Sequence, residues 1–340
     1  MKTAAAQDRP PAQAATMQAI VQDRYGEARD VLRLEETERP EVGDGEVLLR
    51  VDAAGVDRGV WHLMTGLPYP VRLAGYGVRA PSTRIRGREV AGRVEAAGKD
   101  VTAFQVGDEV FGIAEGTFAG YACAQPGKLA RRPDSLTAAQ AAAVPVSALT
   151  ALQAVRDYGH VQAGQKVLVI GASGGVGTYA VQIARAYGAE VTGLCSTAKM
   201  DLVQSIGADH VLDYTRTDIA DGAHRYDVII DTGGNRTLRQ LRGALTPRGT
   251  LVIVGGETSG RWIGGFDRAL RAPVVSRFVS QQLTAVMVAE NAADLVVLAG
   301  LLESGQVTPV VDRTYPLSQA ADAVRHMQEG RARGKVVITI

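Results

Sequence analysis

The sequence predicts an α/β protein built from two domains, a β-rich unit of barrel-like or sandwich-like character and a doubly wound parallel sheet. Its 340 residues are enough for two domains of ordinary size. Residues 17–139 contain short apolar runs punctuated by glycines, a pattern typical of a β-rich unit. After Ala139, strand-like and helix-like segments alternate, and this series is typical of a parallel sheet with helices on both faces.

The expected elements follow from these patterns in chain order. In the β-rich unit, strands are predicted at 19–21, 46–51 and 93–97. The uncharged stretch 135–155 is too weakly hydrophobic to cross a bilayer and predicts a buried helix with a connector. The parallel sheet is predicted to have strands at 167–170, 190–194, 210–212, 228–231 and 251–254, with helices at 199–206 and 238–245. A helix at 317–329 and an apolar strand at 335–340 come last.

Composition restricts the class of partner and the compartment. The 37 Lys and Arg nearly balance the 36 Asp and Glu, so nothing favours nucleic acid or a membrane surface as a partner. Cys123 and Cys195 are the only cysteines, which excludes a multi-cysteine zinc site and fits a reducing cytosol. Residues 1–16 lack apolar periodicity, so we expect a disordered tail. They contain no apolar signal region, so we expect a cytoplasmic protein.

The stretch from Gln165 to Gly177 has the pattern of a strand, a glycine turn and a helix. Such glycines let the backbone approach a pyrophosphate, and the amides at the helix start bind its charge. The spacing G-x-x-G-x-x-G differs from the usual G-x-G-x-x-G, but the flanking strand and helix are both present. We therefore predict a dinucleotide site with Gly174, Gly175 and Val176 at the cofactor. The alternative is a turn that only closes the strand–helix unit.

The end of the second strand bears on the choice of cofactor. An acid there would bind the 2′-hydroxyl of NAD, but no Asp or Glu follows the strand until Asp201. Ser196 could donate a hydrogen bond to a 2′-phosphate and Lys199 could balance its charge, which favours NADP(H). The alternative is that Lys199 is a solvated helix residue. Gly255 and Gly256, at the end of the fifth strand, are also expected to contact the cofactor.

Four motifs in the correct order resemble the medium-chain dehydrogenase/reductase superfamily, and most closely its zinc-independent quinone oxidoreductase branch. They are Gly87-Arg-Glu-Val-Ala-Gly92, Gly107-Asp-Glu-Val-Phe-Gly112, Gly171-Ala-Ser-Gly-Gly-Val-Gly177 and Gly334-Lys-Val-Val-Ile338. The resemblance covers residue 17 to the C-terminus. It implies a GroES-like catalytic domain at 17–139 and 310–340, an inserted Rossmann NADP-binding domain at 140–309, and a homodimer.

The resemblance also implies which residues would replace a catalytic metal. The zinc ligands of related alcohol dehydrogenases correspond to Asp57, Arg88 and Thr150, and a guanidinium cannot ligate zinc. We therefore expect no zinc. Without a Lewis acid, a conjugated acceptor needs less polarisation than a simple ketone. This favours an NADPH-dependent reductase of quinones or α,β-unsaturated carbonyl compounds.

Candidate catalytic residues come from residues 56–69, which align with the family segment that lines the cleft. Asp57 replaces the family's common Asn, and His62 and Tyr69 could protonate an enolate or bind a carbonyl oxygen. Alternatively, both only pack and solvent supplies the proton. By the same resemblance, cofactor contacts are expected from Thr150 and Phe278 at the nicotinamide, Tyr214 at the adenine or 2′-phosphate, and Lys335 at a phosphate or carboxamide.

Three further readings stay open. The four arginines of 261–277 could border the nicotinamide and a subunit boundary, or form a solvated face. The enzyme could be a dehydrogenase or enoyl reductase dedicated to one biosynthetic intermediate. The chain could also be an NADPH-binding sensor or partner protein with little catalysis, because cofactor binding is encoded more clearly than any acid or base.

Overall fold

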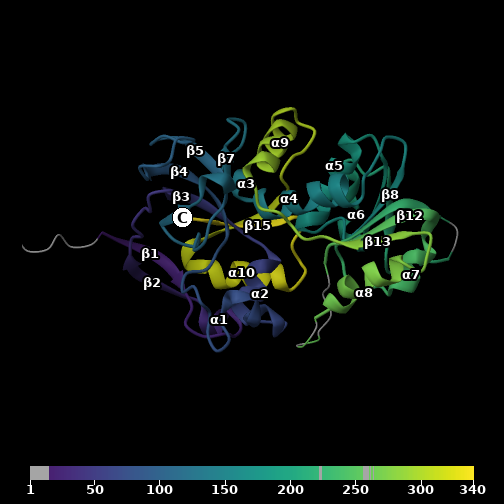
Figure 1. Ribbon diagram of the computed structural model, residues 1–340, viewed down its shortest axis with the longest axis horizontal. Helices are drawn as coiled ribbons and strands as arrows, with labels where there is room; N and C mark the ends of the chain where they lie inside the picture. Colours follow the sequence, from purple (N-terminus) through teal and green to yellow (C-terminus); the bar gives the residue numbers. More distant parts are fainter. Residues whose placement is uncertain (1–14, 222–223, 256–259, 261, 263) are drawn as a thin grey trace, which may run out of the picture.

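The computed structural model describes residues 15–221, 224–255, 260, 262 and 264–340, which form two lobes side by side (Figure 1). Residues 1–14 of the expected disordered tail lie outside the described residues. Thr16 already belongs to β1 (Thr16–Val21) and faces Glu38 of β2 (Arg33–Glu38), so the ordered chain begins before the expected boundary at residue 16.

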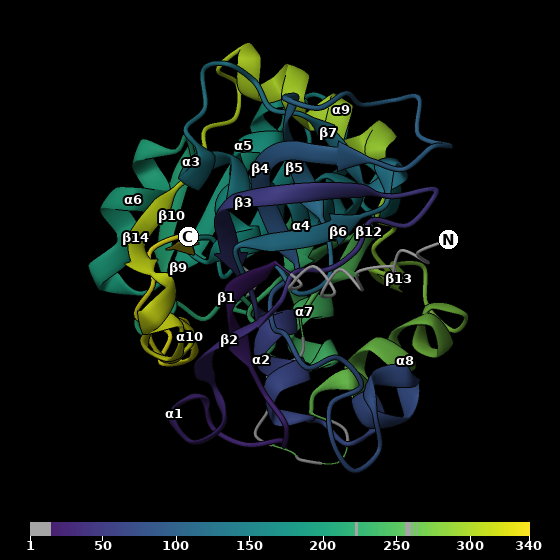
Figure 2. The ribbon, with the colours of Figure 1, turned by 90° about the vertical axis from the view of Figure 1, so that its left-hand side faces the viewer.

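The first lobe, called the barrel lobe here, holds the β1–β2 ribbon and a seven-stranded sheet. The order of the sheet is β14-β15-β3-β4-β5-β7, and β6 also pairs with β3. Figure 2 looks onto this lobe, with β3, β4 and β6 in front. Its strands are β3 (Val47–Val56), β4 (Glu89–Ala97), β5 (Glu109–Ile113), β6 (Tyr121–Ala124), β7 (Leu129–Arg131), β14 (Val311–Pro316) and β15 (Lys335–Thr339).

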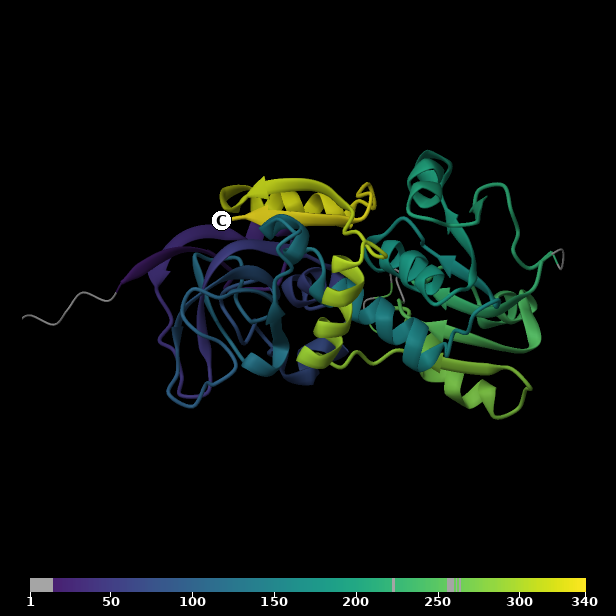
Figure 3. The ribbon, with the colours of Figure 1, turned by 90° about the horizontal axis from the view of Figure 1, so that it is seen from above.

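The end of the chain therefore returns to the barrel lobe. Strand β15 lies between β14, which is parallel to it, and β3, which is antiparallel, with Val336 opposite Val56. Figure 3 shows this C-terminal segment lying along the barrel lobe. The helices of this lobe are α1 (Ala28–Val31), α2 (Arg58–Thr65) and α10 (Ala320–Gln328), with short turns at η1 (Arg72–Tyr76), η2 (Pro126–Lys128) and η5 (Leu317–Gln319).

The second lobe, called the parallel-sheet lobe, has six parallel strands in the order β10-β9-β8-β11-β12-β13. The predicted doubly wound sheet is thus confirmed. These strands are β8 (Lys166–Ile170), β9 (Glu190–Cys195), β10 (His210–Asp213), β11 (Tyr226–Asp231), β12 (Leu245–Ile253) and β13 (Gln282–Ala285). The order of the strands reverses at β8, and ligands of such sheets bind at the carboxyl ends of the strands at this point.

Helices cover both faces of the parallel sheet. Val167 and Val169 of β8 face a cluster that includes α4 and α5, whereas Leu168 and Ile170 face a cluster that includes α7 and α8. This explains why the strand reads as an unbroken apolar run. The helical segments are α5 (Gly175–Ala186), α6 (Met200–Ser205), α7 (Leu238–Gly243) and α8 (Phe266–Ser276), with a short turn at η4 (Thr197–Lys199).

Three helices join the two lobes. The predicted buried helix at 135–155 is confirmed as α3 (Ala138–Ala142) and α4 (Pro145–Gln153), which continues into η3 (Ala154–Tyr158). Helix α9 (Ala292–Glu303) packs on α4 and on β7 of the barrel lobe. Within the described part of the chain, none of the helices has the length and apolar character that a membrane crossing requires.

Candidate functional site

Two adjoining cavities lie where the lobes meet at the carboxyl ends of the parallel strands. The inner cavity, of about 450 Å³, is lined by residues of both lobes, and the outer cavity, of about 970 Å³, extends along the parallel-sheet lobe. Seven residues line both: Arg58, Gly174, Gly175, Val176, Lys199, Thr232 and Gly330. The two cavities therefore share the glycine turn as a common wall.

The glycine turn has the geometry that a pyrophosphate requires. Gly171 has a φ of +79°, which an L side chain rarely adopts, and its carbonyl lies 2.0 Å from where a Cβ at Gly177 would sit. At the start of α5, a Cβ on Gly175 would lie 3.1 Å from Lys335 Cδ and 3.2 Å from Ser147 Oγ. Among the described residues, no side chain caps α5 at Gly174. The first amides of the helix thus face the cavities, and the turn fits a dinucleotide.

Asp57 and His62 reach the inner cavity from the barrel lobe. Asp57 Oδ1 accepts a hydrogen bond from Val60 N at 3.1 Å and so caps α2. His62 Nδ1 lies 2.7 Å from the carbonyl oxygen of Leu67. Because a carbonyl only accepts, Nδ1 must carry a hydrogen, which makes Nε2 the nitrogen that exchanges protons. Both predicted residues line the inner cavity.

Thr150 on α4 and Lys335 at the start of β15 also line the inner cavity. The Thr150 hydroxyl donates to Val146 O at 2.6 Å, which fixes its rotamer. Lys335 is buried and its Nζ forms an ion pair with Glu89, whose Oε1 accepts from Val146 N at 2.9 Å. Burial raises the pKa of Glu89 to about 7, against the opposing effect of Lys335. Lys335, which was expected to contact a cofactor phosphate or carboxamide, is therefore already paired with the buried carboxyl of Glu89.

The outer cavity holds the residues predicted for the 2′-phosphate. Ser196, Lys199 and Tyr214 all line it. Lys199 Nζ donates to the carbonyl oxygens of Gly330 at 2.8 Å and Ala332 at 2.7 Å, and its burial lowers the Lys199 pKa. It is therefore not a solvated helix residue. Arg58, Arg216 and Arg236 add positive charge to this cavity, and Asp218 adds one carboxylate.

Several predicted residues lie elsewhere. Gly255 lines the inner cavity as expected, whereas Gly256 falls outside the described residues. Phe278 follows α8 with 83% of its surface exposed and lines neither cavity, so its cofactor contact stays a prediction. Tyr69 also lines neither cavity. Its ring packs edge-on against Trp262 at 5.1 Å between centroids, and the Arg72 guanidinium lies 4.9 Å from the Tyr69 ring centre.

The residues at the zinc-ligand positions have other roles. Arg88 forms an ion pair with Glu290, which also binds Lys128 at 2.8 Å. Burial would lower the Arg88 pKa, but the carboxylates of Glu290 and Asp57 raise it above its ordinary value. Within the described residues, no group of three or more His, Cys, Asp or Glu side chains could hold a metal ion. The donor set at this place does not fit zinc.

Residues that sequence reasoning missed include Ser147, Thr232 and Gly334. Gly334 lies opposite Gly174 in a parallel bridge, and its amide donates to Ser173 O at 2.9 Å. Gly334 belongs to the motif Gly334-Lys-Val-Val-Ile338, so its place next to Lys335 could have predicted that it lies at the site. Arg268 is buried against Asp231, and only the tertiary structure shows this pair.

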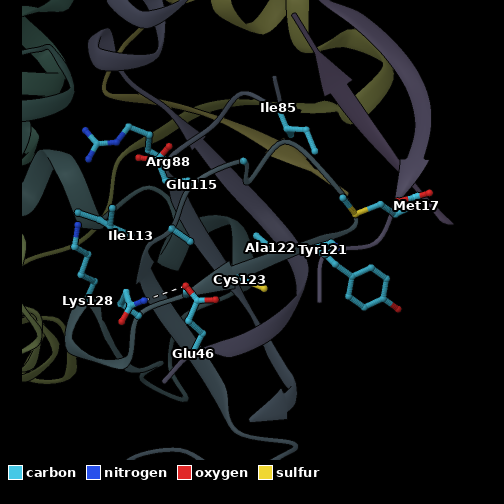
Figure 4. Close-up of a pocket in the computed structure, with 16 residues that line it drawn as sticks. Met17, Glu46, Ile85, Arg88, Ile113, Glu115, Tyr121, Ala122, Cys123 and Lys128 are labelled. Carbon is cyan, nitrogen blue, oxygen red and sulfur yellow. Dashed lines mark hydrogen bonds between the residues drawn. The ribbon is translucent and has the colours of Figure 1, made fainter. Parts of the chain in front are cut away.

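A third cavity, of about 360 Å³, opens in the barrel lobe away from the glycine turn (Figure 4). Cys123 lines it, and its Sγ lies 3.4 Å from Glu41 O. Burial raises the pKa of this thiol. The Arg88 guanidinium points away from Cys123 (Figure 4). Arg88, at one of the zinc-ligand positions, and Lys128 also line this cavity, but none of the residues predicted for catalysis or for the cofactor does.

Comparison with known proteins identifies the family and the fold. Residues 43–134 match the alcohol dehydrogenase GroES-like domain, and residues 206–338 match the zinc-binding dehydrogenase family. The mitochondrial NAD(P)H oxidoreductase RTN4IP1 of Mus musculus is 31% identical over 97% of this chain and 90% of its own length. The chloroplastic quinone-oxidoreductase homolog of Spinacia oleracea is 28% identical over 95% of this chain and 98% of its own length. The quinone oxidoreductase structure from Coxiella burnetii covers 96% of this chain and 100% of its own, with 26% identity and a TM-score of 0.84.

Proposed function

Because the chain belongs to the medium-chain dehydrogenase/reductase superfamily, in its quinone oxidoreductase-like branch, we propose that it is a zinc-independent, NADPH-dependent reductase of quinones or α,β-unsaturated carbonyl compounds. The relatives and the fold support the coarser statement directly: the chain is an oxidoreductase that uses a nicotinamide cofactor. The acceptor, the preference for NADPH and the independence from zinc are the parts that we propose.

One observation carries this proposal. Asp57 and His62 from the barrel lobe, Thr150 from α4 and the glycine turn of the parallel-sheet lobe all line one inner cavity. Gly174, Gly175 and Val176 would hold the pyrophosphate of a bound cofactor, and Thr150 and Gly255 would border its nicotinamide end. That cofactor would supply a hydride, and the cavity walls would place the acceptor against it and exclude water.

The protein groups at this cavity suit protonation of the reduced acceptor. Hydride addition to an enone or quinone leaves negative charge on an oxygen that must be protonated or stabilised. The contact with Leu67 O orients the His62 ring, so that Nε2 can hold or release the proton. Asp57 fixes the start of the helix that carries His62 and adds a carboxylate to the cavity wall.

The proposal excludes zinc because of the donor set. Arg88 occupies the position where related metal enzymes have His, and it is committed to Glu290. Thr150 donates to the backbone, and Asp57 caps α2. Metal analysis of the purified protein should therefore find far less than one zinc per chain. Stoichiometric zinc that is lost on substitution of Asp57 would contradict this part of the proposal.

We further propose a cytosolic homodimer. The family resemblance and the balanced surface charge motivate this expectation, and two observations are consistent with it. Both cysteines are free thiols, as in a reducing compartment. Leu270 and Val274 form an apolar stripe on α8, exposed by 72% and 56%, and Phe278, two residues after the helix, is exposed by 83%. Apolar side chains at this spacing share one face of a helix, and a second copy of the chain would cover them.

The experiment that tests the activity is stopped-flow oxidation of bound NADPH by a panel of quinones and enones. We expect rapid oxidation by at least one class, and His62→Gln should slow it by about 10²-fold or more, the usual contribution of a general acid. His210→Gln is the matched control, because His210 lies on the surface beside Glu190. The affinity for NADPH should be unchanged in both variants, since His62 lies at the acceptor end.

Other outcomes would favour the alternatives. Reaction with only one narrow group of enoyl thioesters would indicate a dedicated enoyl reductase. Tight binding of NADPH without oxidation by any acceptor on a broad panel would favour the sensor or partner protein. A folded protein that binds neither NADPH nor NADH would contradict the proposal as a whole.

A further inference from the structure

Helix α8 forms one wall of the inner cavity, and a single buried side chain ties its first half to the parallel sheet. Gly265, at the N-terminus of α8, and Ala269, one turn later, both line the cavity. Arg268 lies between them with only 7% of its surface exposed. Its guanidinium points toward the carboxyl ends of the strands rather than to solvent. Arg268 therefore does not belong to a solvated face, which was one alternative for the four arginines of 261–277.

The Arg268 guanidinium binds three acceptors that lie on different segments. Nη1 is 2.7 Å from Asp231 Oδ2 and 2.7 Å from Arg236 O, and Nη2 is 2.8 Å from Gly255 O. Asp231 is the last residue of β11, and Gly255 follows β12. One planar group thus joins α8 to the carboxyl ends of two strands, and the Gly255 end lines the inner cavity.

Asp231 organises the opposite side of the same junction. It is fully buried, and its Oδ1 accepts hydrogen bonds from Gly233 N and Gly234 N, both at 3.1 Å. Its backbone carbonyl accepts from Val254 N at 3.0 Å and Gly255 N at 3.2 Å. The two carboxylate oxygens of Asp231 therefore have different partners, since Oδ1 holds the loop at 232–234 and Oδ2 binds Arg268 in the first half of α8.

From this geometry we propose that Arg268 is a positioning residue for the nicotinamide end of the site. It sets the separation between the α8 wall and the floor made by the ends of β11 and β12. The outer cavity, where the adenosine half of a cofactor would lie, does not include α8. The inference rests on the proposed function in one respect, namely that the reaction at this site is hydride transfer from the nicotinamide.

The variant Arg268→Lys tests this role. Lysine keeps a positive charge beside buried Asp231 but cannot bridge three acceptors with a planar fork. We expect the dissociation constant of NADP⁺ to rise about tenfold or more, and single-turnover hydride transfer to slow by a similar factor. Binding of 2′,5′-ADP, which fills only the adenosine end, should weaken less, because Arg236 is the one acceptor of Arg268 that lines the outer cavity. Amide exchange in 266–276 of the ligand-free protein should become faster.

Arg271→Lys is the matched control, because Arg271 lies on the same helix and is exposed. A second variant, Asp231→Asn with Arg268→Gln, covers the case in which Arg268→Lys does not fold. It removes both buried charges and keeps hydrogen-bonding groups, but the shorter glutamine cannot reach all three acceptors. It should therefore fold and show the same selective loss of NADP⁺ binding.

Two outcomes would overturn the inference. An equal loss of 2′,5′-ADP and NADP⁺ binding would mean that Arg268 acts only through the stability of the whole lobe. Unchanged NADP⁺ binding together with unchanged exchange in α8 would mean that it positions nothing. If the wild-type protein transfers hydride to no acceptor, the proposed function fails, but the two binding constants and the exchange rate still decide the role of Arg268.

Discussion

Lys199 shows how one side chain can serve both a ligand and the protein. Its ammonium carries three N–H groups, and two of them bind the carbonyls of Gly330 and Ala332. A third remains for a phosphate in the outer cavity. Arg333 reinforces the same contact, because it donates to Ala198 O at 3.1 Å and pairs with Asp201 at 2.7 Å. The end of β9 and the loop before β15 are thus held together at the predicted 2′-phosphate position.

Lys199→Ala should weaken NADPH much more than NADH. Loss of a charge-assisted hydrogen bond costs about 1.5–3 kcal/mol, so the dissociation constant of NADPH should rise by about tenfold to a hundredfold. Titration of each cofactor by fluorescence would measure this, with Lys166→Ala on the surface as the control. An equal loss for both cofactors would mean that Lys199 acts through the loop at 330–332 and not on the phosphate.

Glu89 gives the protein a specific dependence on pH. Its folded pKa of about 7 lies above the ordinary value of 4.5, so the folded state binds more protons between these values. The free energy of unfolding must therefore fall as pH rises from about 4.5 to about 7, as far as this group determines it. Glu89→Gln should remove this slope in denaturant titrations at several pH values.

The surface variant Glu303→Gln should keep the wild-type slope, because Glu303 is exposed at the end of α9. Glutamine resembles the protonated carboxyl, so Glu89→Gln should be close to the wild type in stability below about pH 4.5, and the two should diverge as pH rises toward about 7. A Glu89→Gln protein with an unchanged slope would show that other groups control the stability in this range.

At the scale of elements, the start of α5 is the most constrained part of the fold. Gly175 opens this helix with little room for a Cβ, which would lie 3.1 Å from Lys335 Cδ and 3.2 Å from Ser147 Oγ, whereas Gly300 of α9 has no atom within 4 Å of the same position. Gly175→Ala should therefore weaken binding of NADPH while the protein stays folded, because Lys335 and Ser147 line the same cavity and must shift to admit the methyl group. Calorimetric titration and the thermal midpoint would measure the two effects.

Gly300→Ala is the matched control, since it adds the same methyl group to a helix. It should leave cofactor binding unchanged and stabilise the protein by about 0.5–1 kcal/mol, the cost of glycine in a helix. If Gly175→Ala still binds NADPH with wild-type affinity, the glycine turn is only the closure of a strand–helix unit.

The sequence predicts elements well where both faces of a strand are buried. Strands β8, β9, β11 and β12 appear as apolar runs because helices cover them on both sides. Strand β2 was missed because its sequence Arg-Leu-Glu-Glu-Thr-Glu is polar and half exposed. Strand β13 has only four residues at the sheet edge, and α8 contains Pro273, which argues against a helix.

The residues of the site also differ in how well the sequence predicts them. The glycine turn, Ser196 and Lys199 could be predicted because local spacing after a strand fixes their position. Asp57 and His62 could be predicted only because their segment resembles a known family. Arg268 was one of four arginines that could border the nicotinamide, but its contacts could not be predicted, since its partners are 37 residues away at Asp231 and on a loop after another strand. Phe278 was assigned by resemblance alone, and the structure places it after α8, exposed and outside both cavities.

At the scale of the whole molecule, the exposed stripe on α8 predicts self-association. Sedimentation velocity should give a mass twice the 35.8 kDa of the chain. Leu270→Asp with Phe278→Asp should shift the protein toward monomer, because burying two carboxylates in an apolar contact is costly. Val106→Asp, at an exposed apolar residue of the barrel lobe, should not. A wild-type protein that sediments as a monomer at micromolar concentration would contradict this.

The position of β15 inside its sheet has a consequence for biosynthesis. Residues 335–339 lie between β14 and β3, so an interior strand of the barrel lobe is made after every other strand of that sheet. Residues 166–285, which hold all six parallel strands, leave the ribosome earlier. While translation continues, the nascent chain can therefore form the parallel sheet, but it lacks Gly334 and Lys335 against the glycine turn. Newly made protein should therefore acquire its coenzyme only after Gly334 and Lys335 have left the ribosome.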